Sequence, residues 1–123
     1  MKQLILVFLG GGLGSALRYW IGRYLNTAEY QFPYGTFLVN VVGCLLIGLI
    51  LGFTFKPHSL SNNFIIFVAV GFCGGFTTFS AFAFDNLVYL KTGDLTSFAI
   101  YTLGSLIFGF GAVFIGVWLV RFF

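Results

Sequence analysis

The feature that most constrains the fold is a succession of four long apolar stretches, each separated from the next by a short polar segment. The stretches cover residues 4–25, 33–53, 63–90 and 97–120. Each reaches the roughly 20 residues that a helix needs to cross the hydrocarbon core of a bilayer. Only 7% of the 123 residues are charged, whereas roughly a quarter would be charged in a soluble domain. The sequence therefore predicts a single all-α transmembrane domain with four spanning helices.

The polar segments between the stretches carry residues that form turns. They include Asn26, Pro33, Gly93 and Asp94, and glycine and proline are strong signals for helix ends. His58 stands alone beside a proline in the second segment, so we expect a surface histidine and not a ligand. The first stretch continues beyond the length of a signal-peptide core, so we expect it to remain as a helix.

Composition also bounds the function. The four apolar stretches predict the lipid bilayer as a partner. The formal net charge of +3 is spread along the chain without a basic patch, so we expect no nucleic-acid partner. Cys44 and Cys73 lie inside apolar stretches without metal-site or disulfide spacing, so we expect small packing residues. No nucleophile–base pair or metal cluster is recognisable, so we do not expect an enzyme.

An interruption is predicted near the middle of the third stretch, at Gly74 and Gly75. Glycine destabilises helices, and Thr77 and Thr78 follow it with β-branched side chains and competing hydroxyls. Irregular backbone at membrane depth is tolerated only where protein or water satisfies it. The alternative is a packing face built on Gly71 and Gly75.

The same small-residue spacing occurs elsewhere without a break. The pairs Gly10/Gly14 and Gly48/Gly52 are each four residues apart. Glycines at this spacing let two helices approach closely. We expect both pairs to be packing faces.

The lysines and arginines are balanced across the four spans. Three fall on the side of the chain termini and three on the opposite side: Lys2, Lys56 and Arg121 against Arg18, Arg23 and Lys91. Because membrane orientation follows the Lys/Arg bias of short loops, we expect insertion in both orientations and an antiparallel homodimer. The alternative is a fixed orientation set by folding or by a partner.

Polar residues lie at depth in the second and fourth spans. Thr36, Asn40, Gly43 and Ile47 share one helical face, and Asn40 lies about 10 Å into its helix at 1.5 Å per residue. Tyr101, Ser105 and Gly109 form a second polar stripe. Polar groups inside a membrane are costly and are usually functional. The alternative for Asn40 is an interhelical hydrogen bond that only stabilises the bundle.

The polar groups at depth are neutral donors. Asp85 is on the third span, and we expect it toward a vestibule and not at the centre. Phe79 and Phe82 offer ring edges, which carry the positive part of the aromatic quadrupole. Neutral donors and positive ring edges fit a small, strongly hydrated anion that can bind and still leave.

Three segments of the chain resemble the signatures of the Fluc/CrcB fluoride channels. They are GGLGSALRY at 11–19, GTFLVNVVG at 35–43 and GFCGGFTTFSAF at 71–82. The resemblance extends over the whole chain, and the third signature is highly specific. It implies a dual-topology antiparallel homodimer in a bacterial plasma or inner membrane, with two pores that passively export fluoride and reduce its toxicity.

The resemblance also implies roles for individual residues. The fluoride path would be lined by Asn40, Phe79, Phe82, Ser80, Thr36, Tyr101 and Ser105. Backbone carbonyls of Gly74 and Thr77 from both subunits would hold a structural Na⁺ ion at the dimer interface. Arg18 and Asp85 would be vestibule or structural residues.

Two departures from the pattern and three rival functions remain. Ala81 replaces a common threonine, and Gly109 replaces a hydroxyl residue expected at the far end of the polar stripe on the last span. The main rival function is a small dual-topology multidrug exporter, but that mechanism needs an acid in the first span, which has no Asp or Glu. A non-transporting scaffold would leave Asn40 and the two phenylalanines unexplained, and an enzyme is the least favoured alternative.

Overall fold

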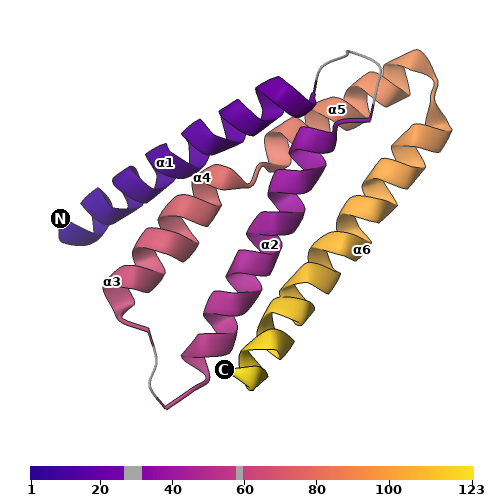
Figure 1. The fold of residues 1–123 in the computed structure, drawn as a ribbon. Coiled ribbons are helices and arrows are strands. Elements are labelled where there is room, and N and C mark those ends of the chain that lie inside the picture. The colour runs from indigo at the N-terminus through magenta and orange to yellow at the C-terminus, as the bar shows by residue number, and fades with distance from the viewer. Residues whose placement is uncertain (27–31, 58–59) are drawn as a thin grey trace.

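The computed structural model describes residues 1–26, 32–57 and 60–123, so the predicted surface position of His58 lies outside the described residues. Every regular element in these residues is helical (Figure 1). The first two spans are α1 (Lys2–Leu25) and α2 (Tyr34–Thr54). The third comprises α3 (Asn62–Ile65), the π-helix η1 (Ile66–Cys73), α4 (Gly74–Phe76) and α5 (Phe79–Thr92). The fourth comprises α6 (Leu95–Leu119) and the 3₁₀ turn η2 (Val120–Phe122).

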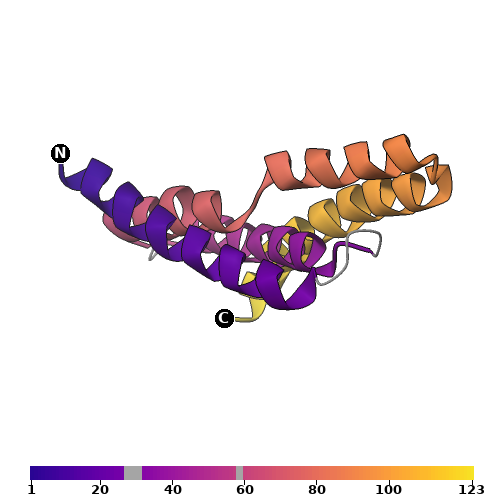
Figure 2. The ribbon, with the colours of Figure 1, turned by 90° about the horizontal axis from the view of Figure 1, so that it is seen from above.

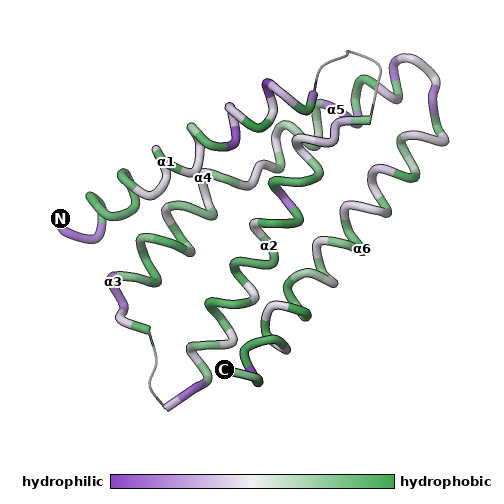
Figure 3. The backbone as a smooth tube through the Cα atoms, viewed as in Figure 1, coloured by the Kyte–Doolittle hydropathy of each residue, from purple (hydrophilic) through white to green (hydrophobic). Residues whose placement is uncertain are grey.

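Four helices in the described residues are long and apolar enough to cross a membrane. They are Lys2–Leu25, Tyr34–Thr54, Asn62–Thr92 and Leu95–Phe122. Hydrophobic residues cover most of each helix, and hydrophilic residues gather mainly near the helix ends (Figure 3). The predicted all-helical, four-span architecture is therefore confirmed, and the chain is a multi-pass membrane protein.

The third span is broken, but the predicted position of the break at Gly74 is wrong. Gly74 has helical backbone angles (φ −61°, ψ −37°), and the helix continues through it from η1 into α4. The chain becomes extended three residues later, at Thr77 (φ −82°, ψ 157°) and Thr78 (φ −150°, ψ 118°). The two β-branched residues, and not the glycines, therefore leave the helix.

The glycines before the break form the helix-packing face that the sequence analysis gave as the alternative to a break. A Cβ on Gly71 would lie 3.1 Å from the Cα of Gly10, and one on Gly75 would overlap the carbonyl oxygen of Gly11. Gly14 likewise packs against the backbone of Phe72. Close packing of α1 on η1 and α4 thus offsets the poor helix propensity of glycine.

The second predicted glycine face joins α2 to α6. A Cβ on Gly48 would overlap the carbonyl oxygen of Val113, and one on Gly52 would lie 2.7 Å from a methyl group of Val120. Gly116 approaches the carbonyl of Leu45 from the other side. The packing role predicted for the Gly10/Gly14 and Gly48/Gly52 pairs is confirmed.

Polar residues fix the ends of the helices. The Ser61 hydroxyl accepts the backbone N–H of Phe64, and the Asp94 carboxylate accepts that of Ser97, which are N-cap bonds. Hydrogen bonds from Ser97 hold the pKa of Asp94 below its usual value, so this cap stays charged at neutral pH. Gly93 adopts φ 75° after α5, the left-handed conformation that ends helices at glycine.

The helices separate into two groups around α2. In Figure 1, α2 lies between the α3–η1–α4 half of the third span and α6. Seen from above, α5 runs beside α6 and apart from α1 and α4 (Figure 2). Within the described chain, α5 makes most of its contacts with α6 and few with α2. The break thus carries the third span from one side of α2 to the other.

Candidate functional site

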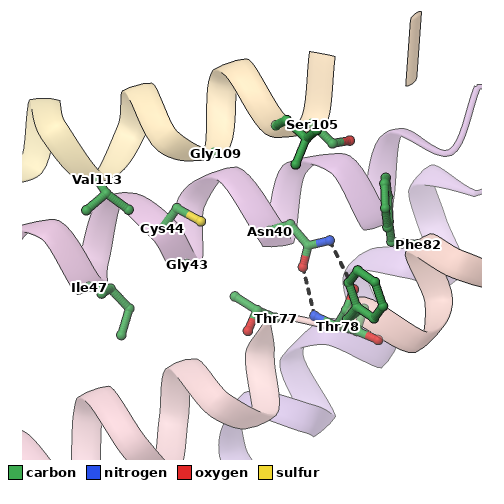
Figure 4. Close-up of a pocket in the computed structure, with 12 residues that line it drawn as sticks. Asn40, Gly43, Cys44, Ile47, Thr77, Thr78, Phe82, Ser105, Gly109 and Val113 are labelled. Carbon is green, nitrogen blue, oxygen red and sulfur yellow. Dashed lines mark hydrogen bonds between the residues drawn. The ribbon is translucent and has the colours of Figure 1, made fainter. Parts of the chain in front are cut away.

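A groove of about 330 Å³ lies where the break meets α2, α5 and α6 (Figure 4). Within the described residues it is lined by neutral side chains alone. Its lining residues are Asn40, Gly43, Cys44, Ile47, Thr77, Thr78, Phe79, Phe82, Ser105, Leu106, Gly109 and Val113. The polar atoms of Asn40, Thr77, Thr78 and Ser105 therefore share one space in an otherwise apolar surrounding.

Asn40 bridges α2 to the break through two hydrogen bonds. Its Oδ1 accepts the backbone N–H of Thr78 at 2.7 Å, and its Nδ2 donates to the Thr78 carbonyl at 3.1 Å (Figure 4). The backbone N–H can only donate, so it fixes which amide atom is oxygen. Asn40 thus replaces the helical acceptor that the Thr78 N–H loses at the break, and it adds a donor to the Thr78 carbonyl, which is the N-cap carbonyl of α5.

These bonds leave Asn40 with spare donor capacity. A carboxamide has two N–H groups, and the bond to the Thr78 carbonyl uses one of them. The other N–H remains for a ligand in the groove that Asn40 lines. The two interpretations of Asn40, bundle stabilisation and ligand binding, are therefore compatible in one side chain.

Phe79 and Phe82 lie on the first turn of α5, and both line the groove. Their ring centroids are 5.8 Å apart with the planes tilted by 43°. Phe82 also packs on Tyr101 at 5.2 Å, whereas Phe79 is 80% exposed. The Phe82 ring is thus held by contacts within its own chain, whereas the exposed Phe79 ring can contact another molecule.

The predicted polar stripe on the last span is divided. Ser105 lines the groove, and its hydroxyl is buried without a hydrogen-bond partner among the described residues. Tyr101 is completely buried and donates its hydroxyl to the Asp85 carboxylate at 3.0 Å. Ser105 therefore offers a hydroxyl to the groove. Tyr101 does not line the groove, and its hydroxyl is bonded to Asp85.

The structure does not bring Thr36 and Ser80 into the lining of the groove. Thr36 is buried one turn before Asn40 and accepts a hydrogen bond from Asn26 Nδ2 at 3.3 Å. Ser80 is exposed, and its hydroxyl pairs with that of Thr78 at 3.2 Å. Each of the two hydroxyls thus has one hydrogen-bond partner within the single chain.

The break deprives the carbonyls of residues 74–77 of the N–H donors that a continued helix would supply, and two of these N–H groups bond to side chains instead. A continued helix would direct the N–H of Thr78 to the Gly74 carbonyl, but Asn40 takes it. It would direct the N–H of Ala81 to the Thr77 carbonyl, but the Thr78 hydroxyl accepts it at 3.1 Å. The carbonyls of Gly74 and Thr77, which were predicted to bind sodium, are thus among the four that lose their helical donors.

Arg18 occupies a third carbonyl of this region. Its Nε donates to the Gly75 oxygen at 2.9 Å, and the Ser15 hydroxyl lies 3.4 Å from the same atom. A cation there complements the negative end of the helical segment that stops at Phe76. Of the two roles predicted for Arg18, the structure places it in a structural contact.

Sequence reasoning missed several residues of this region. Thr78 contributes its backbone, its hydroxyl and a wall of the groove. A threonine just before an apolar helix is an N-cap signal, and this signal marks the start of α5. Cys44, predicted as packing, lines the groove, and no sequence signal marks this position.

Four spanning helices and a groove of neutral polar groups at membrane depth define a small multi-pass membrane protein of the channel and transporter class. A family model described as CrcB-like protein, Camphor Resistance (CrcB), matches residues 5–117. The chain therefore belongs to the CrcB family, and the family predicted from the three signatures is confirmed.

Curated relatives match almost the full length of the chain. It is 43% identical over 120 residues to the fluoride-specific ion channel FluC of Phocaeicola vulgatus, with 97% of this chain and 98% of the relative covered. It is 45% identical over 126 residues to a protein of the same name from Gloeothece citriformis, with 98% of each covered. A third, from Azobacteroides pseudotrichonymphae, is 39% identical over 124 residues, with 100% of this chain and 99% of the relative covered.

Proposed function

We propose that this protein is an ion channel that conducts fluoride passively out of the bacterial cytoplasm. The observation that carries the proposal is the neutral, donor-bearing groove at membrane depth in a chain whose full-length relatives are named fluoride-specific ion channels. The relatives supply the identity of the ion, and the groove supplies a chemistry that suits it.

The groove can replace part of the hydration shell of a small anion. The spare N–H of Asn40 and the unpartnered hydroxyl of Ser105 are donors. The edges of the Phe79 and Phe82 rings carry partial positive charge. Because the described residues that line the groove include no full cation, an anion is not held too tightly to leave, as conduction requires.

The proposed path is completed by a second, antiparallel copy of the chain. Phe79 is 80% exposed and Ser80 is exposed beside the groove, so both can face a partner subunit. The balanced lysines and arginines favour insertion in both orientations. Ser80 would then join the path from the dimer interface, whereas Thr36 would support it from behind Asn40.

The antiparallel arrangement has a direct test. A single reporter cysteine in place of the exposed, uncharged Thr96, in a chain with Cys44 and Cys73 replaced by serine, should react with an impermeant thiol reagent from both sides of the membrane. Labelling from one side alone would refute dual topology, and the proposed dimer with it.

The freed carbonyls of Gly74 and Thr77 would hold the structural Na⁺ ion where two copies meet. Neutral oxygens suit a hard monovalent cation, and its binding would offset the cost of leaving buried carbonyls without donors. A Cβ on Gly74 would meet nothing within 4 Å, so this surface is open to a second copy. Thr77→Ala should retain the ion, because the side chain donates to the Cys73 carbonyl and the backbone oxygen is the ligand. A high-resolution structure of the dimer in sodium buffer, with water on the axis, would refute the site.

The multidrug exporter suggested as an alternative gains no support. Its mechanism needs an acid in the first span, and α1 contains none. The relatives are named ion channels and not enzymes or exporters.

The proposed function is tested most simply in cells. A bacterium without its own means of fluoride export should grow at higher fluoride concentrations when it produces this chain. The Asn40→Asp variant, produced at the same level, serves as the control. Equal fluoride sensitivity with and without the chain would contradict the proposal.

A further inference from the structure

We infer that Asn86 and Thr102 are positioning residues of the conduction path, which hold the turn of α5 that carries Phe82 in register against α6. The predicted loss of fluoride flux rests on the proposed function, whereas the predicted change in the position of Phe82 does not. Neither residue lines the groove, and neither lies in the three signature segments of the sequence.

Two hydrogen bonds connect these residues to the turn. The Nδ2 of Asn86 donates to the carbonyl of Phe82 at 3.0 Å. The Oγ1 of Thr102 donates to the Oδ1 of Asn86 at 2.9 Å. Asn86 is only 7% exposed, so its amide has little access to any other partner. The chain of bonds thus runs from α6, through one buried amide, to the backbone of Phe82 itself.

The register of α5 depends on such bonds because its packing is sparse. In Figure 2, α5 stands apart from α1 and α4, and its main contact within the described chain is α6. A smooth apolar contact would let two helices slide or rotate. A buried amide in a bilayer has no water to replace a lost partner, so the bond between Asn86 and Thr102 favours one register.

A second hydrogen bond, between Tyr101 and Asp85, favours the same register of α5 against α6. Tyr101 donates to Asp85 at 3.0 Å, so consecutive residues of α6 bond consecutive residues of α5. Tyr101 also packs on the Phe82 ring. A shift of α5 along α6 would break both bonds together and move this ring.

The turn that bears the two phenylalanines is therefore fixed at both ends by asparagines. Asn40 holds the backbone of Thr78 at its beginning, and Asn86 holds the carbonyl of Phe82 at its end. The exposed Phe79 lies between these anchors. Positioned rings can present their edges to the groove without reorganising when the anion arrives.

The test uses Thr102→Val, which keeps the side-chain shape and removes the donor, with Thr102→Ser as the matched control that keeps the hydroxyl. Fluoride efflux from liposomes should fall roughly three- to tenfold in the valine variant, since interhelical hydrogen bonds in membranes have modest strength. It should stay near wild type in the serine variant. Asn86→Leu breaks the same bond from the other helix, and adding Thr102→Val to it should cause no further loss.

A spectroscopic readout separates positioning from general stability. With 4-fluorophenylalanine at position 82, the ¹⁹F resonance should shift or broaden in Thr102→Val. The same label at Phe114, which is 74% exposed on α6, should not change. This measurement tests the inference even if wild-type protein carries no fluoride, an outcome that would refute the proposed function alone.

Three results would overturn the inference. One is wild-type flux and an unchanged resonance at position 82 in Thr102→Val. Another is an equal loss of flux in the valine and serine variants, which would indicate packing and not the hydrogen bond. The third is an equal spectral change at positions 82 and 114, which would indicate general loosening of the fold. If Thr102→Val does not yield folded protein, Asn86→Leu is judged by the same spectra.

Discussion

Replacement of Asn40 by aspartate should nearly abolish fluoride flux. One carboxylate oxygen can still accept the N–H of Thr78, as the amide oxygen does at 2.7 Å. The other oxygen has no proton to donate to the Thr78 carbonyl, which the amide nitrogen reaches at 3.1 Å. The remaining N–H that faces the groove is also lost. A group that attracts an anion thus becomes one that repels it.

The size of the effect follows from the electrostatics of the groove. A fluoride ion passing about 4 Å from the carboxylate meets a repulsion of about 4 kcal/mol at an effective dielectric of roughly 20. Since about 1.4 kcal/mol corresponds to a factor of ten in rate, this barrier alone lowers flux about 10³-fold. Because the groove is lined by neutral side chains within the described residues, no neighbouring cation in its wall offsets the charge.

The assay is fluoride efflux from liposomes that contain purified protein, followed with a fluoride electrode. The matched control is Asn63→Asp, which makes the same chemical change at an exposed position near the start of the third span. The control should retain wild-type flux. Elution volume and thermal unfolding show whether each variant is folded. Folded Asn40→Asp protein with undiminished flux would refute the placement of the path at this groove.

Three further predictions follow from the same geometry. Phe82→Ile keeps apolar bulk but removes the ring edge, so flux should fall at least tenfold without loss of folded protein; unchanged flux would contradict a role for the ring. Gly14→Leu should destabilise the protein by about 1–3 kcal/mol or more because its Cβ would overlap the Phe72 carbonyl, whereas Gly12→Leu should be tolerated since nothing lies within 4 Å there; equal thermal stability would contradict the packing. Two added lysines within residues 92–96 should bias insertion and lower flux, and an oppositely biased variant should restore it; undiminished flux despite one-sided insertion would count against the antiparallel dimer.

The four spans could be predicted from the sequence because length and hydropathy are local properties. The observed bounds, such as Lys2–Leu25 and Tyr34–Thr54, lie close to the expected ranges. The break was placed three residues too early because glycine propensity was weighed without its packing partners. The backbone of α1 fills the space beside Gly71 and Gly75, and that contact is visible only in three dimensions.

The candidate site was partly predictable because the spacing of residues along one helix shows which of them share a face. Helical spacing alone placed Asn40, Gly43 and Ile47 on the face that lines the groove. It also placed Thr36 there, but the first turn of α2 is covered and Asn26 occupies this hydroxyl. Spacing within one helix cannot show which neighbouring helix covers a given turn.

The bond between Asn86 and Thr102 could not be predicted. Asn86 and Thr102 are separated by a turn and belong to different helices, and their bond depends on the register of α5 against α6. Nothing in the local sequence fixes that register. The role of a polar residue that lies inside an apolar segment and outside any signature can be inferred only when its partners on other helices are known.

The central claim is tested most directly by ion efflux from liposomes that contain the purified wild-type protein. Liposomes loaded with fluoride should empty rapidly, and matched liposomes loaded with chloride should retain their ion over the same interval. Fluoride efflux should also proceed down its own gradient without a proton gradient, since the proposed conduction is passive. Fluoride release no faster than from protein-free liposomes would contradict the account.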